Sequence, residues 1–141
     1  MKKVINSTVS VILALVFVLC FISCNTVDNT GVWENATHLK DKEFGKGATT
    51  VEVEVKAGEQ SVTFTIHTDK TILGDALIEH GLIDGEQGPY GLYVKSVNGI
   101  VADYDVDKTY WAFYIGGEYA MTGVDGTEIT DGAHYELVRE K

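Results

Sequence analysis

Two neighbouring segments of this sequence alternate apolar and polar residues, which is the period of a β-strand that buries only one face. In residues 51–55 valine occupies every second position, and in residues 62–66 Val, Phe and Ile do the same. Residues 57–60 between them favour a turn, so the pattern predicts a β-hairpin with both apolar rows on one side. Such a hairpin is stable only when a second layer covers its apolar face.

The segment after the hairpin has the residues to form that second layer. Its apolar positions recur at helical spacing and are Ile72, Leu73, Ala76, Leu77 and His80. Asp69 or Thr71 can cap the start of a helix, and Gly81 can end it. We therefore expect one amphipathic helix that packs on the sheet.

Further strands are predicted after this helix. Residues 85–89 contain Gly and Pro and predict a break, after which a strand over 92–97 ends at the turn Asn98-Gly99. Two more strands are expected over residues 110–115 and 135–139. The order of hairpin, helix and strands predicts an α+β domain, a β-grasp-like mixed sheet with one helix packed on one face.

The strand over residues 110–115 is the most aromatic part of the chain and has two different faces. Its side chains alternate, with Trp111, Phe113 and Ile115 on one face and Tyr110, Ala112 and Tyr114 on the other. We expect Trp111 and Phe113 in the core opposite the helix, although a tryptophan at the boundary of two faces can also contact a ligand. The tyrosine face is then free to bind something outside the core.

We take six residues as candidate ligand contacts: Tyr93, Tyr110, Trp111, Tyr114, Tyr119 and Met121. Tyrosine supplies rigid, amphipathic contact area with a hydroxyl that fixes orientation, which suits macrocycles, sugars and protein partners alike. The alternative is that these rings only cover the sheet against solvent.

The N-terminus predicts export. Lys2 and Lys3 precede an apolar run over residues 11–22, which is shorter than the about 20 residues of a membrane-spanning helix and fits a secretory signal. The segment Phe21-Ile22-Ser23-Cys24 resembles the lipobox of bacterial lipoproteins, which implies cleavage before Cys24 and its lipidation. An uncleaved anchor and ordinary secretion with a spare thiol are the alternatives. A lipid-anchored protein on the outer side of the bacterial cytoplasmic membrane is our expectation.

The composition excludes one class of partner. Removing residues 1–23 takes away two lysines and no acid, which changes the net charge from −10 to −12. A surface this acidic repels phosphate backbones, so nucleic acid is not an expected partner. Residues 24–47 are mostly polar and predict a flexible tether, with the folded domain over 48–141. Trp33 in this tether can cover an edge of the domain or lie in solvent.

Part of this pattern resembles a known family. The resemblance rests on Tyr93–Ile100, Thr109–Ile115, Gly123-Val124, Asp131-Gly132 and Tyr135–Leu137. These segments resemble the C-terminal domain of transcobalamin and intrinsic factor, and a large group of bacterial surface lipoproteins resembles that domain too. The similarity covers roughly Thr50 to Glu140. It implies a β-grasp lid that closes over cobalamin carried by a separate helical domain, so that this chain supplies one half of a site.

Metal and catalytic motifs find little support. Asp103, Asp105 and Asp107 begin like a calcium loop, but Lys108 occupies the turn glycine and Tyr114 the bidentate glutamate, so a solvated acidic loop is expected. The four histidines lack a metal-ligand spacing. There is no GxSxG elbow and no glycine-rich phosphate loop. We predict a protein that is not an enzyme and requires no cofactor.

These observations combine into one functional hypothesis with two alternatives. The hypothesis is a cell-surface, lipid-anchored binding module that captures cobalamin, another corrinoid or a similar small molecule and passes it to a membrane transporter. The first alternative is a protein–protein or surface-display module whose aromatic face meets a surface protein. Carbohydrate binding is the second, because exposed aromatic rings also stack on sugars.

Overall fold

The computed structural model describes residues 30–141. The predicted signal peptide and the lipidation site Cys24 lie outside this range. The helices and strands are α2 (Thr30–Trp33), β1 (Lys42–Gly45), β2 (Thr49–Ala57), β3 (Gln60–Thr68), α3 (Leu73–Glu79), β4 (Ile83–Gly88), β5 (Gly91–Val97), β6 (Ile100–Val101), α4 (Tyr104–Asp107), β7 (Tyr110–Ile115), β8 (Glu118–Tyr119), η1 (Val124–Gly126) and β9 (His134–Glu140).

A six-stranded mixed sheet is the centre of the domain. Its strand order is β1-β3-β2-β9-β7-β8, with β2 antiparallel to β3 and parallel to β9. The alternating runs pair in register as the predicted hairpin, with Val51 opposite Ile66 and Val53 opposite Phe64. The predicted α+β class with a β-grasp-like mixed sheet is confirmed.

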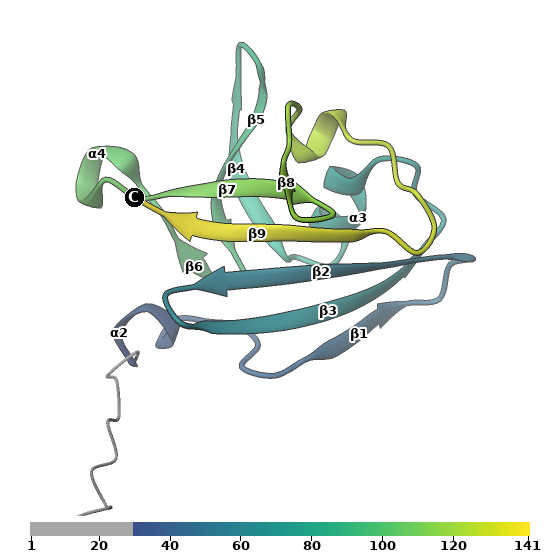
Figure 1. Ribbon diagram of the computed structural model, residues 1–141, viewed down its shortest axis with the longest axis horizontal. Coiled ribbons are helices and arrows are strands. Elements are labelled where there is room, and N and C mark those ends of the chain that lie inside the picture. Colours follow the sequence, from purple (N-terminus) through teal and green to yellow (C-terminus); the bar gives the residue numbers. More distant parts are fainter. Residues whose placement is uncertain (1–29) are drawn as a thin grey trace, which may run out of the picture.

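Helix α3 and a second sheet of order β4-β5-β6 cover one face of the large sheet, and within residues 30–141 the other face is open (Figure 1). The apolar rows of β2 and β3 meet this cover. Phe64, Ile66, Leu73 and Leu77 each have 0% of their surface exposed. Burying a side chain of this size contributes about 1.5–3 kcal/mol to folding, so the covered face supplies most of the driving force.

Two local predictions are corrected by hydrogen bonding. Helix α3 begins after Ile72 without a side-chain cap, because Asp69 Oδ1 instead accepts the Ala48 N–H at 2.9 Å. Residues 85–88, expected as a break, lie in strand β4. Gly85 sits at a bulge where an added Cβ would lie 2.1 Å from the Tyr93 carbonyl oxygen, so the glycine allows close pairing rather than ending the strand.

The N-terminal strap, residues 30–45, is folded where a flexible tether was expected. Trp33 is 4% exposed, and its indole N–H donates to the Ala57 carbonyl oxygen at 2.9 Å. The buried Asn98 side chain accepts from the His38 N–H and donates to the His38 carbonyl oxygen. Strand β1 then pairs in parallel with β3. The folded domain therefore begins well before residue 48, because one aromatic ring completes the core.

Strands β4 and β5 form an arm, residues 83–97, that rises beyond the large sheet on the side away from α2 (Figure 1). Its tip is tied to the loop around η1, where the Leu92 N–H donates to Asp125 Oδ2 at 2.8 Å. Gly91 has φ 106°, and an added Cβ would meet that carboxylate at 2.7 Å. Only glycine allows the arm to approach the loop this closely.

Candidate functional site

Strand β7 separates its aromatic side chains as the sequence predicts. Trp111 and Phe113 are each 8% exposed and lie on the covered side, whereas Tyr110 and Tyr114 lie on the open face and are half-buried. The Trp111 indole N–H donates to the Ile100 carbonyl oxygen at 3.2 Å. Trp111 is therefore part of the core, and its inclusion among the candidate ligand contacts is corrected.

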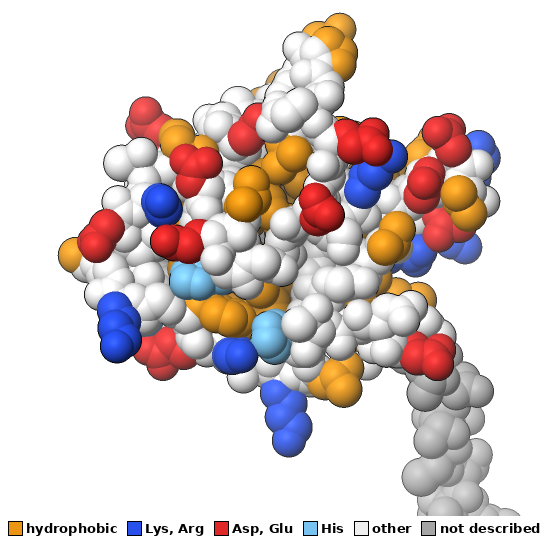
Figure 2. Space-filling model, turned by 180° about the vertical axis from the view of Figure 1, so that it is seen from behind, with side chains coloured by type: hydrophobic (Ala, Val, Ile, Leu, Met, Phe, Trp, Pro, Cys, Tyr) orange, Lys and Arg blue, Asp and Glu red, His pale blue; other side chains and the backbone are white. Residues whose placement is uncertain are grey.

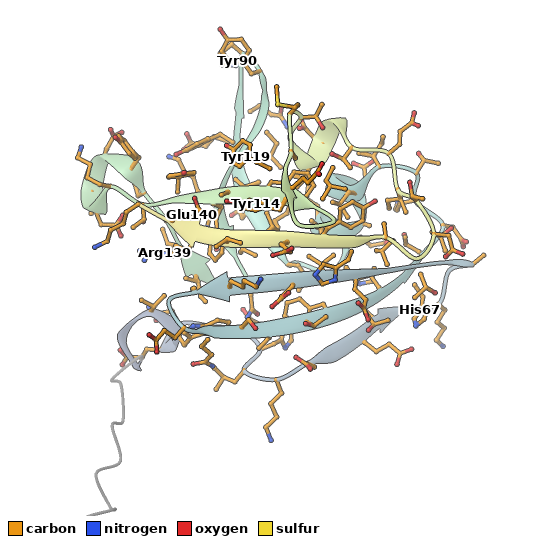
Figure 3. All side chains as sticks on the ribbon, viewed as in Figure 1. His67, Tyr90, Tyr114, Tyr119, Arg139 and Glu140 are labelled. Carbon is orange, nitrogen blue, oxygen red and sulfur yellow. The ribbon has the colours of Figure 1, made fainter. Side chains whose placement is uncertain are left out.

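Two tyrosine hydroxyls contact one carboxylate on the open face, and a third tyrosine packs against one of these two rings. The Tyr114 hydroxyl donates to Glu140 Oε1 at 2.6 Å, and the Tyr110 hydroxyl donates to Glu140 Oε2 at 3.2 Å. Tyr119 lies opposite Tyr114 in the β7–β8 ladder, with ring centroids 5.5 Å apart and planes at 87°. We call Tyr110, Tyr114, Tyr119 and Glu140 the tyrosine cluster (Figure 3).

The register of the sheet explains why these residues meet. Strands β7 and β9 run antiparallel, which places Tyr110 directly opposite Glu140 and Tyr114 opposite Glu136. Tyr110 and Glu140 are directly opposite and therefore close enough to interact. Tyr114 reaches Glu140 along the strands through the length of both side chains. The turn at Gly116-Gly117, with φ 59° and 85°, folds β8 back so that Tyr119 joins them.

The carboxylate changes the acidity of the tyrosines. The hydrogen bond from Tyr114 to Glu140 raises the pKa of that phenol from 10.0 to about 12, because ionisation would place two negative charges side by side. The same carboxylate raises the pKa of Tyr110. Both phenols therefore stay neutral at physiological pH and keep their hydroxyl groups as hydrogen-bond donors.

Tyr93 and Met121 lie apart from this cluster. Tyr93 is 45% exposed on the arm, and Met121 is 96% exposed on the loop after β8. The ring contacts found in residues 30–141 do not connect Tyr93 with the cluster. The structure thus brings together three of the six predicted contacts, places one in the core and leaves two at the arm and its neighbouring loop.

Tyr90 at the tip of the arm is 99% exposed and belongs to the same end of the molecule (Figure 3). Seen from behind, hydrophobic side chains form this tip (Figure 2). A shallow cavity of about 260 Å³ lies there, lined by residues 88–93. Pockets for drug-sized ligands usually have volumes of about 300–1,000 Å³, so this cavity is too small to enclose such a ligand. The tip is instead a projection that a partner could contact.

A metal centre does not fit the described part of the chain. Within residues 30–141 no group of three or more His, Cys, Asp or Glu side chains is arranged to hold a metal ion. The acidic segment that begins like a calcium loop forms helix α4, in which Asp103 caps the helix by accepting the Asp105 N–H. The Asp103 carboxylate therefore stabilises the start of helix α4.

One constellation has the atoms of a nucleophile and a base. His67 Nδ1 is 2.9 Å from the Thr50 hydroxyl, and His67 Nε2 is 2.5 Å from Glu43 Oε1 (Figure 3 labels His67). Thr50 lies inside strand β2, and its backbone N–H donates to Asp131. The Thr50 backbone N–H is thus already hydrogen-bonded and cannot stabilise an oxyanion next to the Thr50 hydroxyl. The geometry therefore supports a structural role for Thr50 and His67.

Sequence reasoning missed Glu140 and Tyr90. Glu140 lies one residue from the end of a chain rich in acids, and only the β7–β9 register distinguishes it from the others. Tyr90 follows Gly88 and Pro89, which predict a turn but give no sign that the turn projects. A hairpin prediction over residues 83–97 would have placed Tyr90 at an exposed tip.

In comparisons with known proteins, one family model matches part of the chain and two solved structures are similar to it. Residues 69–134 match the model of a domain of unknown function (DUF4430). The crystal structure of a "putative metal binding protein" from Ruminococcus gnavus ATCC 29149 is similar, with a TM-score of 0.63 and 34% identity, over 66% of this chain and 97% of that chain. No curated protein matches the sequence.

The second related structure is haptocorrin in complex with Cbi. The similarity has a TM-score of 0.51 and 20% identity and covers 70% of this chain but 26% of haptocorrin. The chain thus spans about a quarter of the length of haptocorrin, and the likeness concerns the fold. This similarity of fold agrees with the resemblance to the transcobalamin C-terminal domain that the sequence predicts.

Proposed function

Because the chain carries a DUF4430 domain with a β-grasp-like fold, we propose that it is a binding module which captures a small amphipathic molecule on the tyrosine cluster, with a corrinoid as the leading candidate. The observation that carries this proposal is the contact of Tyr110 and Tyr114 with Glu140, with Tyr119 packed on Tyr114, on a sheet face that residues 30–141 leave uncovered. These rings are held in place before any ligand arrives, and preorganisation lowers the entropic cost of binding.

A corrinoid suits the chemistry of this surface. Flat, partly apolar ring systems pack well on tyrosine faces, and their amide substituents can donate to a carboxylate such as Glu140. The similarity to haptocorrin supports the fold of such a module and not its ligand. A metal ion alone is not the ligand that we propose, since residues 30–141 offer no set of three ligands for it.

We further propose that the module works without catalysis outside the cytoplasmic membrane, anchored through lipid on Cys24, and hands its ligand to a membrane transporter. The apolar run and lipobox support the anchor. No helix in residues 30–141 has the length and apolar character needed to cross a membrane. The described chain enters at α2, so the arm would point away from an anchored N-terminus (Figure 1).

The test is a titration of the full chain in neutral detergent with cobalamin and with cobinamide, followed by tryptophan fluorescence and corrin absorbance. Saturable binding that weakens about tenfold in a double Tyr110→Ala, Tyr114→Ala variant is expected, as each lost ring contact is worth about 0.5–1.5 kcal/mol. Tyr104→Ala is the matched control, because Tyr104 is 53% exposed on α4 and lies outside the cluster. The absence of any spectral change at millimolar corrinoid would contradict the corrinoid proposal.

A protein partner is the second candidate function, and the shape of the arm favours it. Tyr90 and Met121 are 99% and 96% exposed and project outward, as anchors that insert into a partner do. A photo-reactive phenylalanine analogue at position 90 should then crosslink a surface protein in intact cells. The same analogue at Leu39, which is 60% exposed on the strap, serves as the control. Equal crosslinking from both positions would refute a specific partner at the tip.

A further inference from the structure

We infer that the tyrosine cluster receives a positively charged group of the organic ammonium class. This inference rests on the proposed binding function and names the chemistry of the group that contacts Tyr110, Tyr114, Tyr119 and Glu140. It combines two independent features of the cluster, a carboxylate whose charge is not balanced and a pair of perpendicular aromatic rings.

Glu140 differs from the other carboxylates of the open face near the cluster, because each of those has a basic side chain as a partner. Its neighbour on the same strand, Glu136, pairs with the Lys56 ammonium at 2.8 Å. Glu54 is 3.6 Å from the same ammonium and 3.3 Å from His134 Nε2. In contrast, the ion pairs found in residues 30–141 do not include Glu140. Its partners are two neutral phenols, which leave a full negative charge.

The basic residue next to Glu140 in the sequence is directed elsewhere. Arg139 donates to Asp107 Oδ2 at 2.6 Å and to the Val101 carbonyl oxygen at 3.1 Å. Adjacent residues of a strand point to opposite faces, so this guanidinium lies on the far side of the sheet from Glu140. Arg139 and Glu140 are labelled in Figure 3.

The rings supply a second reason for a cation. Tyr114 and Tyr119 meet edge to face at 87° with centroids 5.5 Å apart, and Tyr119 is 61% exposed, so aromatic surface stays open to a ligand. Aromatic faces carry negative charge density, and cages of such faces recognise quaternary ammonium groups. The cation–π contacts found within residues 30–141 are those of Lys42 with Phe44 and of Lys108 with Tyr104, outside the cluster.

The cluster is also accessible and rigid. Tyr119 is 61% exposed, and Tyr110 and Tyr114 are half-buried. The two hydroxyl groups that hold the Glu140 carboxylate stay protonated, since the hydrogen bond to Glu140 raises the pKa of both phenols. A cation would therefore meet neutral rings in fixed positions. The acidic chain as a whole, with a net charge of −10, also concentrates cations near its surface.

The experiment compares choline with its neutral isostere 3,3-dimethylbutan-1-ol at constant ionic strength. The full chain in neutral detergent is titrated with each probe, and the tyrosine ring signals are followed by NMR. Choline should shift the Tyr114 and Tyr119 signals saturably, and the neutral isostere should not. Glu140→Gln, which keeps a hydrogen-bond acceptor but removes the charge, should weaken choline binding about two- to fivefold. Glu59→Gln on an exposed turn is the control and should leave it unchanged.

The outcomes separate this inference from the proposed function. Equal shifts with choline and the isostere, or full choline binding in Glu140→Gln, would overturn the cation inference even if a corrinoid binds. Choline binding together with no corrinoid binding would uphold the inference and contradict the proposed corrinoid ligand. Tyr119→Leu keeps an apolar side chain but removes the aromatic ring that packs against Tyr114. It should weaken choline binding, whereas unchanged binding would overturn the assignment to this cluster.

Discussion

The N-terminal strap and the β4–β5 arm both contribute side chains to the core, yet the strap buries its tryptophan whereas the arm carries an exposed tyrosine at its tip. The strap inserts Trp33 into the core and is held by the side chain of Asn98. The arm extends Tyr90 into solvent and is tied at its tip by Asp125. The strap therefore stabilises the domain, and the arm is free to contact a partner.

The difference lies in where each aromatic side chain finds a complementary surface. Trp33 fills the end of the core and satisfies its indole N–H with the Ala57 carbonyl oxygen. Tyr90 sits at a hairpin tip beyond the reach of the core, where no such surface exists in the described chain. Trp33 therefore contributes to the stability of the domain, whereas the Tyr90 ring stays available for contacts outside it.

Removing the Trp33 ring is expected to cause the largest effect. Trp33→Ala leaves a cavity and removes the hydrogen bond to the Ala57 carbonyl oxygen, and should lower the free energy of unfolding by about 3–5 kcal/mol. Urea unfolding followed by circular dichroism measures this. Leu39→Ala in the same strap removes a side chain that is 60% exposed and should change stability by less than about 0.5 kcal/mol. Equal effects would show that the strap does not depend on its tryptophan.

The Asn98 bridge should contribute the next largest amount. Asn98→Ala removes two hydrogen bonds to His38 and places alanine at a φ of 52°. A loss of about 2–3 kcal/mol in unfolding free energy is expected from these terms. Asn98→Gly keeps the backbone conformation and should lose less. If both variants unfold at the urea concentration of the native chain, the strap is held by Trp33 alone.

On the arm, Asp125 is expected to have a smaller and more local effect. Asp125→Ala removes the acceptor of the Leu92 N–H, which should cost about 1–2 kcal/mol and speed hydrogen exchange at that amide. Asp125→Asn retains a side-chain oxygen and should restore much of the protection. Exchange rates that stay unchanged at Leu92 would contradict the view that Asp125 positions the arm.

The strap should also loosen in acid through His38. Burial among Phe44 and Phe64 lowers the pKa of His38 below its ordinary 6.5, and the nearby Lys42 lowers it further. The unfolded chain therefore takes up the proton first, so stability is complete above pH 6.5 and declines as the pH falls below that value. Urea midpoints at pH 7.5 and 5.5 measure the decline. The dependence should be weaker in His38→Gln, and an equal dependence would assign it to other groups.

The smallest effect is expected at the tip of the arm. Tyr90→Ala removes a ring that is 99% exposed and should change the free energy of unfolding by less than about 0.5 kcal/mol. The same variant should abolish the binding of a partner at the tip. A marked loss of stability would mean that the ring packs on the domain, and the contrast with the strap would fail.

Much of the fold follows from patterns of short period. The alternation in residues 51–66 predicts the central hairpin, and strand β7 begins and ends where the aromatic run does. Glycine-containing segments are where prediction fails. Gly85 lies inside the paired strand β4, whereas Gly88 is the last residue of the same strand. Glycine permits many conformations, so its role depends on what lies beside it.

The candidate site is predictable in part for the same reason. The period of two assigns Tyr110 and Tyr114 to one face and Trp111 to the other without any structure. It cannot reveal that Glu140, about 30 positions along the chain from Tyr110, accepts from both hydroxyl groups. Strand register across a sheet depends on pairing between distant segments, which local spacing does not encode.

The sequence alone determined the alternation of faces, the amphipathic helix, the aromatic strand and the acidity of the chain, because each depends on composition or on residues a few positions apart. Tertiary structure decided that the strap is part of the core, that the arm projects and that two tyrosine hydroxyls meet one carboxylate without a basic partner. Those outcomes depend on contacts between segments distant in sequence, and only the packed fold brings such segments together.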